Sequence, residues 1–268
     1  MKQDGRSIPV KEPYLPGVAL FLVVLGLAAL LKFHFSKAGS EELAWILGPL
    51  AWTVDLVSGM NFQAENGAGY VSGNGRYIIA PECAGINFMI AVLLTGAAIV
   101  KMVPGSFRVQ YKRIALIVVT AYLFTVIVNS LRIVLAMELY TLDIYSPWCT
   151  AERVHRVVGI LLYFPALLLY GLFFHRQFSG DNRHAVIGWS LLWYLWLSLG
   201  IPLVTGSFQD SGLLFYEHGL TVILSCSAIV CICHWFLKLI SGVATSGSGK
   251  LSTVLSSELL PVQRVYRG

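Results

Sequence analysis

The sequence has few charged residues: Asp, Glu, Lys and Arg make up 12% of it, against roughly 25% in a typical soluble domain. Hydrophobic residues make up 56% of the chain, and the mean hydropathy is +0.71. So little charge among so many apolar residues excludes a soluble globular domain. The composition predicts a polytopic membrane protein.

The sequence also lacks a continuous basic stripe. Its net charge is +5, but the basic residues fall in short clusters between apolar segments. That pattern is typical of membrane topology and not of a nucleic-acid-binding face, so we expect membrane lipids and no nucleic acid as partners. The apolar run at 17–31 continues to Phe35 without a small-residue cleavage site, which predicts a retained helix and not a signal peptide.

Metal-binding cysteine pairs are absent too. The cysteines form no CxxC pair and no metal-ligand spacing, so we expect no metal and no other cofactor. The segment CSAIVCICH resembles a metal site at first sight, but its three cysteines do not share one helix face, which favours a packing role. The five cysteines are Cys83, Cys149, Cys226, Cys231 and Cys233.

Six apolar runs are long enough to span a bilayer, which takes roughly 20 mostly apolar residues. They cover residues 16–35, 83–103, 114–138, 154–174, 186–205 and 218–240. A seventh run, 43–60, contains Pro49 and Asp55 and is expected to span, to re-enter or to lie in the interface. The sequence thus predicts an all-α bundle of six to seven transmembrane helices in one domain, 1–240, followed by a flexible Ser- and Gly-rich tail, 241–268.

The loops predict how the bundle is oriented. Residues 61–82 are rich in Gly, Asn and Ser, with short β-prone pieces at 69–72 and 76–79, and we expect an exposed hairpin or loop there. Lys and Arg gather near 101–113 and 176–183 and in the C-terminal tail, a bias that marks the cytoplasmic side. The loops 61–82, 139–153 and 206–217 are then extracytoplasmic. The side of the N-terminus depends on whether 43–60 spans.

Three polar residues on different helices lie at a similar predicted depth. With a rise of about 1.5 Å per residue, Cys83 lies roughly 27 Å from Lys101, Arg132 about 28 Å from Arg113, and His155 about 31 Å from Arg176. Since the second residue of each pair marks the inner basic boundary, all three polar residues are expected near the outer ends of their helices.

A thiol, a guanidinium and an imidazole at one level suggest nucleophilic cysteine catalysis. Pro81 suits a helix start, which would place Cys83 in a first turn, where free N–H groups and the macrodipole favour a thiolate. His155 would take the thiol proton and return it to a leaving amine, and Arg132 would stabilise the thiolate or an oxyanion. Glu82 would oppose the thiolate unless it points away, so we expect it to serve the helix start or to pair with an arginine.

Simpler interpretations exist for each residue taken alone. A lone membrane cysteine is usually a small packing residue, and a lone arginine near a helix end usually extends to the interface. A lone histidine at a helix start is often a boundary residue. Cys83 and Cys149 are both predicted on the outer side, where disulfides form, and a disulfide between them would remove the nucleophile. A thiol-redox membrane enzyme using these two cysteines, or a non-enzymatic assembly protein, therefore stays an alternative.

The same residues resemble the signatures of the exosortase/archaeosortase family of membrane cysteine transpeptidases. PECAGINF is similar to its Cys-Ser/Ala-Gly signature, which includes Cys83 and Gly85, and VNSLRI, which contains Asn129 and Arg132, is similar to its Asn-x-x-Arg signature. HRVVGI, beginning at His155, is similar to its His-x-x-x-Gly signature. The stretch before Cys83 resembles the K-type exosortases most.

The resemblance implies a catalytic core at about 40–175, with Cys83 as nucleophile, Arg132 as stabilising cation and His155 as proton carrier. It implies supporting roles for Glu82, Gly85 and Asn129. The implied substrates are surface proteins with a C-terminal motif, one transmembrane helix and a basic tail, which are cleaved and passed to an unidentified glycan or lipid acceptor. The implied location is the bacterial cytoplasmic (inner) membrane, with the site on the extracytoplasmic side.

Overall fold

The computed structural model describes residues 14–142, 145–146, 150–178, 183–206 and 215–235. The chain divides into two compact units, Met1–Ile223 and Leu224–Gly268, and each is described by itself. The described part of the second unit is the end of one helix, Phe215–Trp235. The predicted tail at 241–268 lies outside the described residues, and the single domain over 1–240 stays a prediction.

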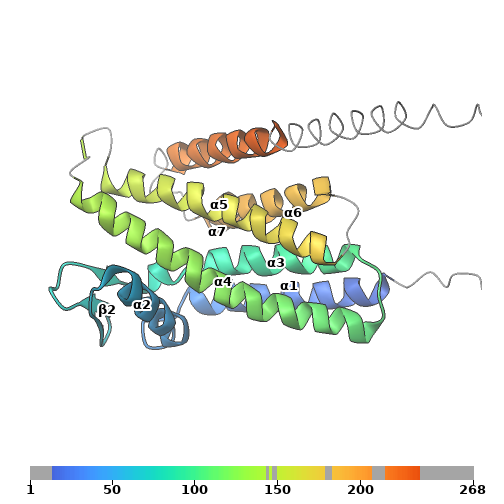
Figure 1. Cartoon of the computed structure of the whole chain (residues 1–268), viewed down its shortest axis with the longest axis horizontal. Coiled ribbons are helices and arrows are strands. Elements are labelled where there is room, and N and C mark those ends of the chain that lie inside the picture. Colours follow the sequence, from blue (N-terminus) through green and yellow to red (C-terminus); the bar gives the residue numbers. More distant parts are fainter. Residues whose placement is uncertain (1–13, 143–144, 147–149, 179–182, 207–214, 236–268) are drawn as a thin grey trace, which may run out of the picture. The chain divides into compact units, whose positions relative to one another are not determined.

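The described residues contain six helices that are long and apolar enough to cross a membrane, as the sequence predicts (Figure 1). Their helical elements are α1 (Leu15–Phe35), α3 (Ile86–Met102), α4 (Phe107–Thr141), α5 (Ala151–Gln177), α6 (Arg183–Leu195) with a π-helical turn (Trp196–Gly200) and α7 (Ile201–Thr205), and the helix Phe215–Trp235. The protein is therefore an all-α polytopic membrane protein with a small sheet.

Helix α3 is the core of the bundle. In the span Pro81–Met102, 78% of the apolar window is buried, because α3 packs against α1, α4, α5 and α6. Glycines permit the closest approaches: a Cβ on Gly96 would lie 2.6 Å from Ile117, and one on Gly171 would lie 2.8 Å from Val186. Small residues at helix contacts are typical of membrane bundles, where tight packing drives association.

The seventh apolar run forms helix α2 (Ala44–Ser58), which has 15 residues. At about 1.5 Å per residue it is roughly 22 Å long, shorter than the hydrocarbon core of about 30 Å. It packs against α4, where the Tyr122 hydroxyl donates to the Trp45 carbonyl at 2.9 Å. The structure thus favours a non-spanning α2.

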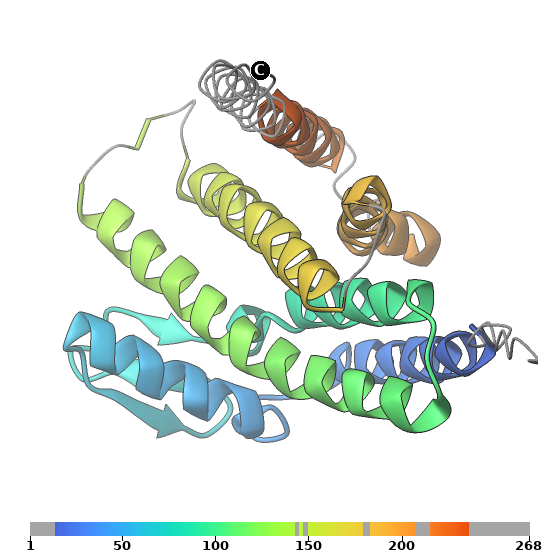
Figure 2. The same ribbon diagram turned by 45° about the vertical axis from the view of Figure 1, so that its right-hand side comes forward.

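A three-stranded antiparallel sheet follows α2 and packs against it (Figure 2). The strands are β1 (Phe62–Glu65), β2 (Gly69–Ser72) and β3 (Ile78–Ile79), in the order β1-β2-β3. Asp55 accepts a hydrogen bond from the Phe62 backbone N–H at 2.9 Å and so joins α2 to β1. The loop predicted at 61–82 is therefore ordered, and we call the end of the bundle that carries it the sheet end.

Candidate active site

Cys83 lies at the sheet end in a short 3₁₀ turn, Pro81–Ala84. Pro81 starts the turn, as the sequence predicts, and the Cys83 N–H donates to the Ala80 carbonyl at 2.8 Å. The expectation that Cys83 belongs to the first turn of the long helix is wrong. Gly85 interrupts the chain in the left-handed region, at φ 71°, and α3 begins only at Ile86.

Gly85 brings the cysteine turn against α4. A Cβ at Gly85 would lie 2.7 Å from the Asn129 amide nitrogen, so only glycine fits this contact. The Asn129 side chain is fully buried, and its amide donates to the Cys83 carbonyl at 2.5 Å. Gly85 and Asn129, both predicted as supporting residues, thus hold the backbone of Cys83 in place.

Arg132 and His155 are in direct contact, through the Arg132 Nη2 and the His155 Nε2. The Arg132 Nη1 also donates to the Tyr163 hydroxyl at 3.2 Å, and its guanidinium lies 5.3 Å from the centre of the Tyr163 ring. The Tyr163 hydroxyl in turn donates to the Asn129 Oδ1 at 2.5 Å. A continuous polar network therefore runs from His155 through Arg132, Tyr163 and Asn129 to the backbone of Cys83.

The arginine contact defines the tautomer of His155. A guanidinium only donates, so the His155 Nε2 accepts, and Nδ1 carries the proton of a neutral ring. Gly159, one turn further along α5, borders the arginine: a Cβ there would make an ordinary van der Waals contact with the Arg132 Nε, at 3.5 Å. His155 and Gly159, the two ends of the His-x-x-x-Gly spacing, thus lie on the face of α5 that is next to Arg132.

A cavity of about 160 Å³ connects the cysteine with the histidine, since both line it. The rest of its wall is mostly apolar and comes from the sheet and α4. These residues are Phe62, Tyr77, Ile78, Ile79, Ile133, Ala136, Met137 and Tyr140. A reacting group in this cavity would meet the Cys83 thiol and the His155 imidazole. Arg132 does not line the cavity, but it contacts the imidazole.

The structure brings together the predicted residues Cys83, Gly85, Asn129, Arg132 and His155. Glu82 is exposed. Cys83 is a free cysteine, whereas Cys149 lies outside the described residues, so the predicted alternative of a pair between them stays open.

Sequence reasoning missed Tyr163, which bonds two members of the network. A signal for it exists: His155, Gly159 and Tyr163 are spaced four residues apart and so share one face of α5. Phe62 was missed as a cavity residue as well, because a strand at 62–65 was not predicted, whereas Tyr77, Ile78 and Ile79 lie in the predicted β-prone piece at 76–79.

Comparison with known proteins gives one match. A family model described as transmembrane exosortase (Exosortase_EpsH) matches residues 15–172, a range that contains Cys83, Arg132 and His155. No curated protein and no solved structure matches the chain. The K-type resemblance stays a prediction.

Proposed function

The chain belongs to the transmembrane exosortase family, and from this premise we propose that it is a cysteine transpeptidase with Cys83 as nucleophile. The observation that carries the proposal is the shared cavity of Cys83 and His155, together with the contact between His155 and Arg132. A nucleophile, a base and a permanent cation are the groups that acyl transfer through a thioester requires.

In the proposed reaction, His155 takes the Cys83 thiol proton and the thiolate attacks a peptide carbonyl of the substrate. The C–N bond of the tetrahedral intermediate then breaks, and the leaving amine takes the proton from the imidazolium. This leaves a Cys83 thioester, and an acceptor nucleophile attacks its carbonyl while giving a proton to His155. The C–S bond then breaks, and the leaving Cys83 thiolate takes that proton from the imidazolium. Each proton that the histidine accepts is thus returned within its half-reaction.

The role of Arg132 follows from its present partner. While it donates to the His155 Nε2, that lone pair is occupied, so proton transfer requires the guanidinium to leave the imidazole. An oxyanion forming beside Cys83 would attract it. We infer that the Arg132 guanidinium leaves the His155 imidazole and binds the oxyanion as the thiolate attacks.

We propose as substrates surface proteins that end in a short motif, one transmembrane helix and a basic tail. The cavity beside Cys83 opens among Ile78, Ile79 and Met137, so it suits an apolar residue next to the scissile bond. A substrate helix would lie beside the bundle while its motif enters at the sheet end. The acceptor would be a glycan or a lipid.

We propose the bacterial inner membrane as the location, with the sheet end outside. Basic residues at the opposite end, such as Lys101, Arg108 and Arg113, support this orientation through the positive-inside rule. Six spans among the described residues, with α2 too short to be a seventh, also agree with a cytoplasmic start of α1.

The decisive experiment is Cys83→Ala with a co-expressed substrate of the proposed type. We expect full loss of processing, measured as release of the C-terminal segment, at unchanged membrane levels of the enzyme. Cys231→Ala, at an exposed cysteine of the helix Phe215–Trp235, is the matched control and should process normally. Undiminished processing by Cys83→Ala would refute the proposal.

The same assay separates the alternatives. A thiol-redox enzyme that pairs Cys83 with Cys149 would lose as much activity in Cys149→Ser as in Cys83→Ser, whereas a transpeptidase should tolerate Cys149→Ser. A non-enzymatic assembly protein would show no unusually reactive cysteine toward a thiol-directed probe.

A further inference from the structure

Tyr163 belongs both to the polar network of the candidate active site and to the wall of a second cavity. The volume of this cavity is about 280 Å³, close to the lower end of the roughly 300–1,000 Å³ that is typical of ligand sites. Its other walls come from α3, the π-helical turn and the helix Phe215–Trp235, with Asn87, Ser198 and His218. The two cavities share no lining residue among those described, so this one is a separate site beside the network.

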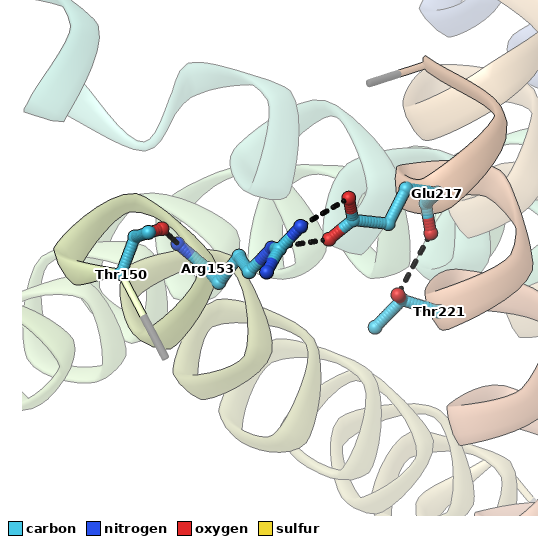
Figure 3. A network of polar contacts seen from close by, with 4 residues as sticks. All are labelled: Thr150, Arg153, Glu217 and Thr221. Atoms are coloured by element: carbon cyan, nitrogen blue, oxygen red, sulfur yellow. Dashed lines mark hydrogen bonds and ion pairs between the residues drawn. The ribbon is translucent and has the colours of Figure 1, made fainter. Parts of the chain in front are cut away.

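The helix that carries His218 is attached to α5 by a charged pair. Figure 3 shows Arg153 and Glu217 facing each other in a fork, with Nε to Oε1 at 2.7 Å and Nη2 to Oε2 at 2.9 Å. The Arg153 backbone N–H donates to the Thr150 hydroxyl at 3.3 Å, which caps the start of α5. His218 follows Glu217 directly, so the pair holds it at the wall of the second cavity.

Three hydrogen-bonding side chains from three elements line this cavity. The Lys32 Nζ donates to the Asn87 Oδ1 at 2.8 Å, and because an ammonium only donates, the Asn87 NH₂ group is left as a donor. The His218 Nδ1 is buried without a hydrogen-bond partner in the described part of the chain, a state that buried polar atoms rarely keep. Ser198 adds a hydroxyl from a π-helical turn, a feature that is frequent at functional sites.

The remaining wall indicates the class of ligand. Phe88, Tyr163 and Tyr194 give the cavity aromatic surface, and none of its described lining residues is Asp, Glu, Lys or Arg. The C–H face of a sugar ring packs on aromatic rings, whose faces are electron-rich, while its hydroxyls donate and accept hydrogen bonds. A wall of aromatic rings and hydrogen-bonding groups therefore suits a sugar better than an anion.

The cavity lies at the level of lipid headgroups, at the sheet end. Asn87 is near the start of α3, Pro202 near the end of the span Arg183–Thr205, and His218 near the start of its span. We propose that the cavity binds the acceptor of the transpeptidation, as the sugar headgroup of a glycolipid. This inference rests on the proposed function, in which a Cys83 thioester is passed to a glycan or a lipid.

A hydroxyl of this sugar has a short path to the thioester. Asn87 follows Cys83 by four residues, so their Cα atoms are at most about 14 Å apart, even in a fully extended chain. The hydroxyl attacks the thioester carbonyl and gives its proton to His155. The C–S bond then breaks, the Cys83 thiolate takes the proton from the imidazolium, and the product is an ester between the cleaved protein and the sugar.

The test uses the full chain in phosphatidylcholine nanodiscs, a substrate peptide of the proposed type, and octyl β-glucoside as a short glycolipid. Mass spectrometry follows the Cys83 thioester and the glucoside ester that replaces it. We expect ester formation to saturate with glucoside concentration, and 1-octanol, which lacks the sugar, to form roughly tenfold less ester because hydrogen bonds are lost. Hydroxylamine is small and needs no binding site, so it should open the thioester in proportion to its concentration.

Binding is also measured without turnover. Radiolabelled octyl β-glucoside should occupy one saturable site per chain, in Cys83→Ala as in the unmodified chain. His218→Phe keeps an aromatic ring and should weaken this binding about fivefold, the effect of one lost hydrogen bond, without changing the opening of the thioester by hydroxylamine. His34→Phe, at an exposed histidine of α1 at the same end of the bundle, is the matched control and should bind normally.

Ser198→Leu provides a second variant, which fills the cavity without changing its charge and should abolish saturable binding. Each variant is compared with the unmodified chain by its thermal unfolding midpoint without glucoside. A loss of binding at an unchanged midpoint then reports on the cavity and not on the fold.

Four results would overturn the proposal. Octanol as effective as the glucoside would mean that the site recognises only the chain, and equal losses in His218→Phe and His34→Phe would mean that the glucoside binds elsewhere. Phosphatidylglycerol that displaces the glucoside from the nanodisc-bound protein would assign the cavity to a phospholipid headgroup. A thioester that hydroxylamine opens but bound glucoside does not would refute the acceptor role alone. Absence of any thioester would instead refute the proposed function.

Discussion

At the scale of single residues, Tyr163 determines how the cation is held. Its hydroxyl accepts from Arg132 and donates to Asn129, and its ring stacks on Phe88 with centroids 4.4 Å apart. The tyrosine therefore fixes both the guanidinium and the amide that holds the Cys83 carbonyl. We infer that Tyr163 is a positioning residue, because it acts on the reacting groups only through these two side chains.

Tyr163→Phe should lower the turnover rate about tenfold, since one hydrogen bond to a charged group contributes roughly 1.5–3 kcal/mol. The Michaelis constant should change little, because Tyr163 does not line the cavity that contains Cys83. Tyr170→Phe is the matched control: Tyr170 is also on α5 and bonds Thr120 at 2.9 Å, away from this network. Equal losses in both variants, or a rise in the Michaelis constant alone, would contradict the positioning role.

Residue spacing along the helices is enough to predict that Cys83, Arg132 and His155 lie at one level, because a helix advances by a fixed rise. Spacing could not show that Arg132 contacts His155, since that depends on how α4 and α5 are rotated about their axes. The bond from Asn129 to the Cys83 carbonyl was equally hidden, because it joins residues 46 positions apart.

At the scale of elements, the junction between the cysteine turn and α3 is the most constrained part of the site. Hydropathy correctly located the span, but it could not show that Gly85 would break the helix after Cys83. Similarly, hydropathy found the run that forms α2, while its length of 15 residues became clear only from its termination at Gly59, with φ 69°. Strand β1 escaped prediction because its sequence, FQAE, has no β-branched residue.

Gly85→Ala should destabilise the protein and reduce processing. Two effects add: a left-handed backbone at φ 71°, and a Cβ placed 2.7 Å from the Asn129 amide. Gly75→Ala is the matched control, with φ 67° and open space around its Cβ. We expect Gly75→Ala to lower the free energy of unfolding by about 1 kcal/mol, and Gly85→Ala to lower it by about 1–3 kcal/mol more.

Unfolding in detergent, followed by denaturant titration, measures both variants. If they lose the same stability, the contact between Gly85 and Asn129 does not constrain the junction. Processing should fall in Gly85→Ala alone, because only there is the residue that holds the Cys83 carbonyl displaced.

At the scale of the whole molecule, the number of spans decides which side each end of the bundle faces. The sequence left this open, since 43–60 was long and apolar enough to be considered a span. In the structure α2 packs along α4 and connects to the sheet through Asp55, so the chain stays at the sheet end between α1 and α3. The start of α1 and the loop between α3 and α4 then share one side.

Site-directed thiol labelling tests this topology in a variant whose natural cysteines are all alanine. Asn66→Cys, in the exposed β1–β2 turn, should react with a membrane-impermeant maleimide in intact spheroplasts. Ser106→Cys, exposed between α3 and α4, and Tyr14→Cys, exposed before α1, should react only after lysis. Labelling of Tyr14→Cys together with Asn66→Cys would mean that α2 spans the membrane after all. Labelling of Ser106→Cys together with Tyr14→Cys, but not of Asn66→Cys, would mean that the bundle is inverted and that Cys83 lies on the cytoplasmic side, where a substrate already translocated to the surface could not reach it.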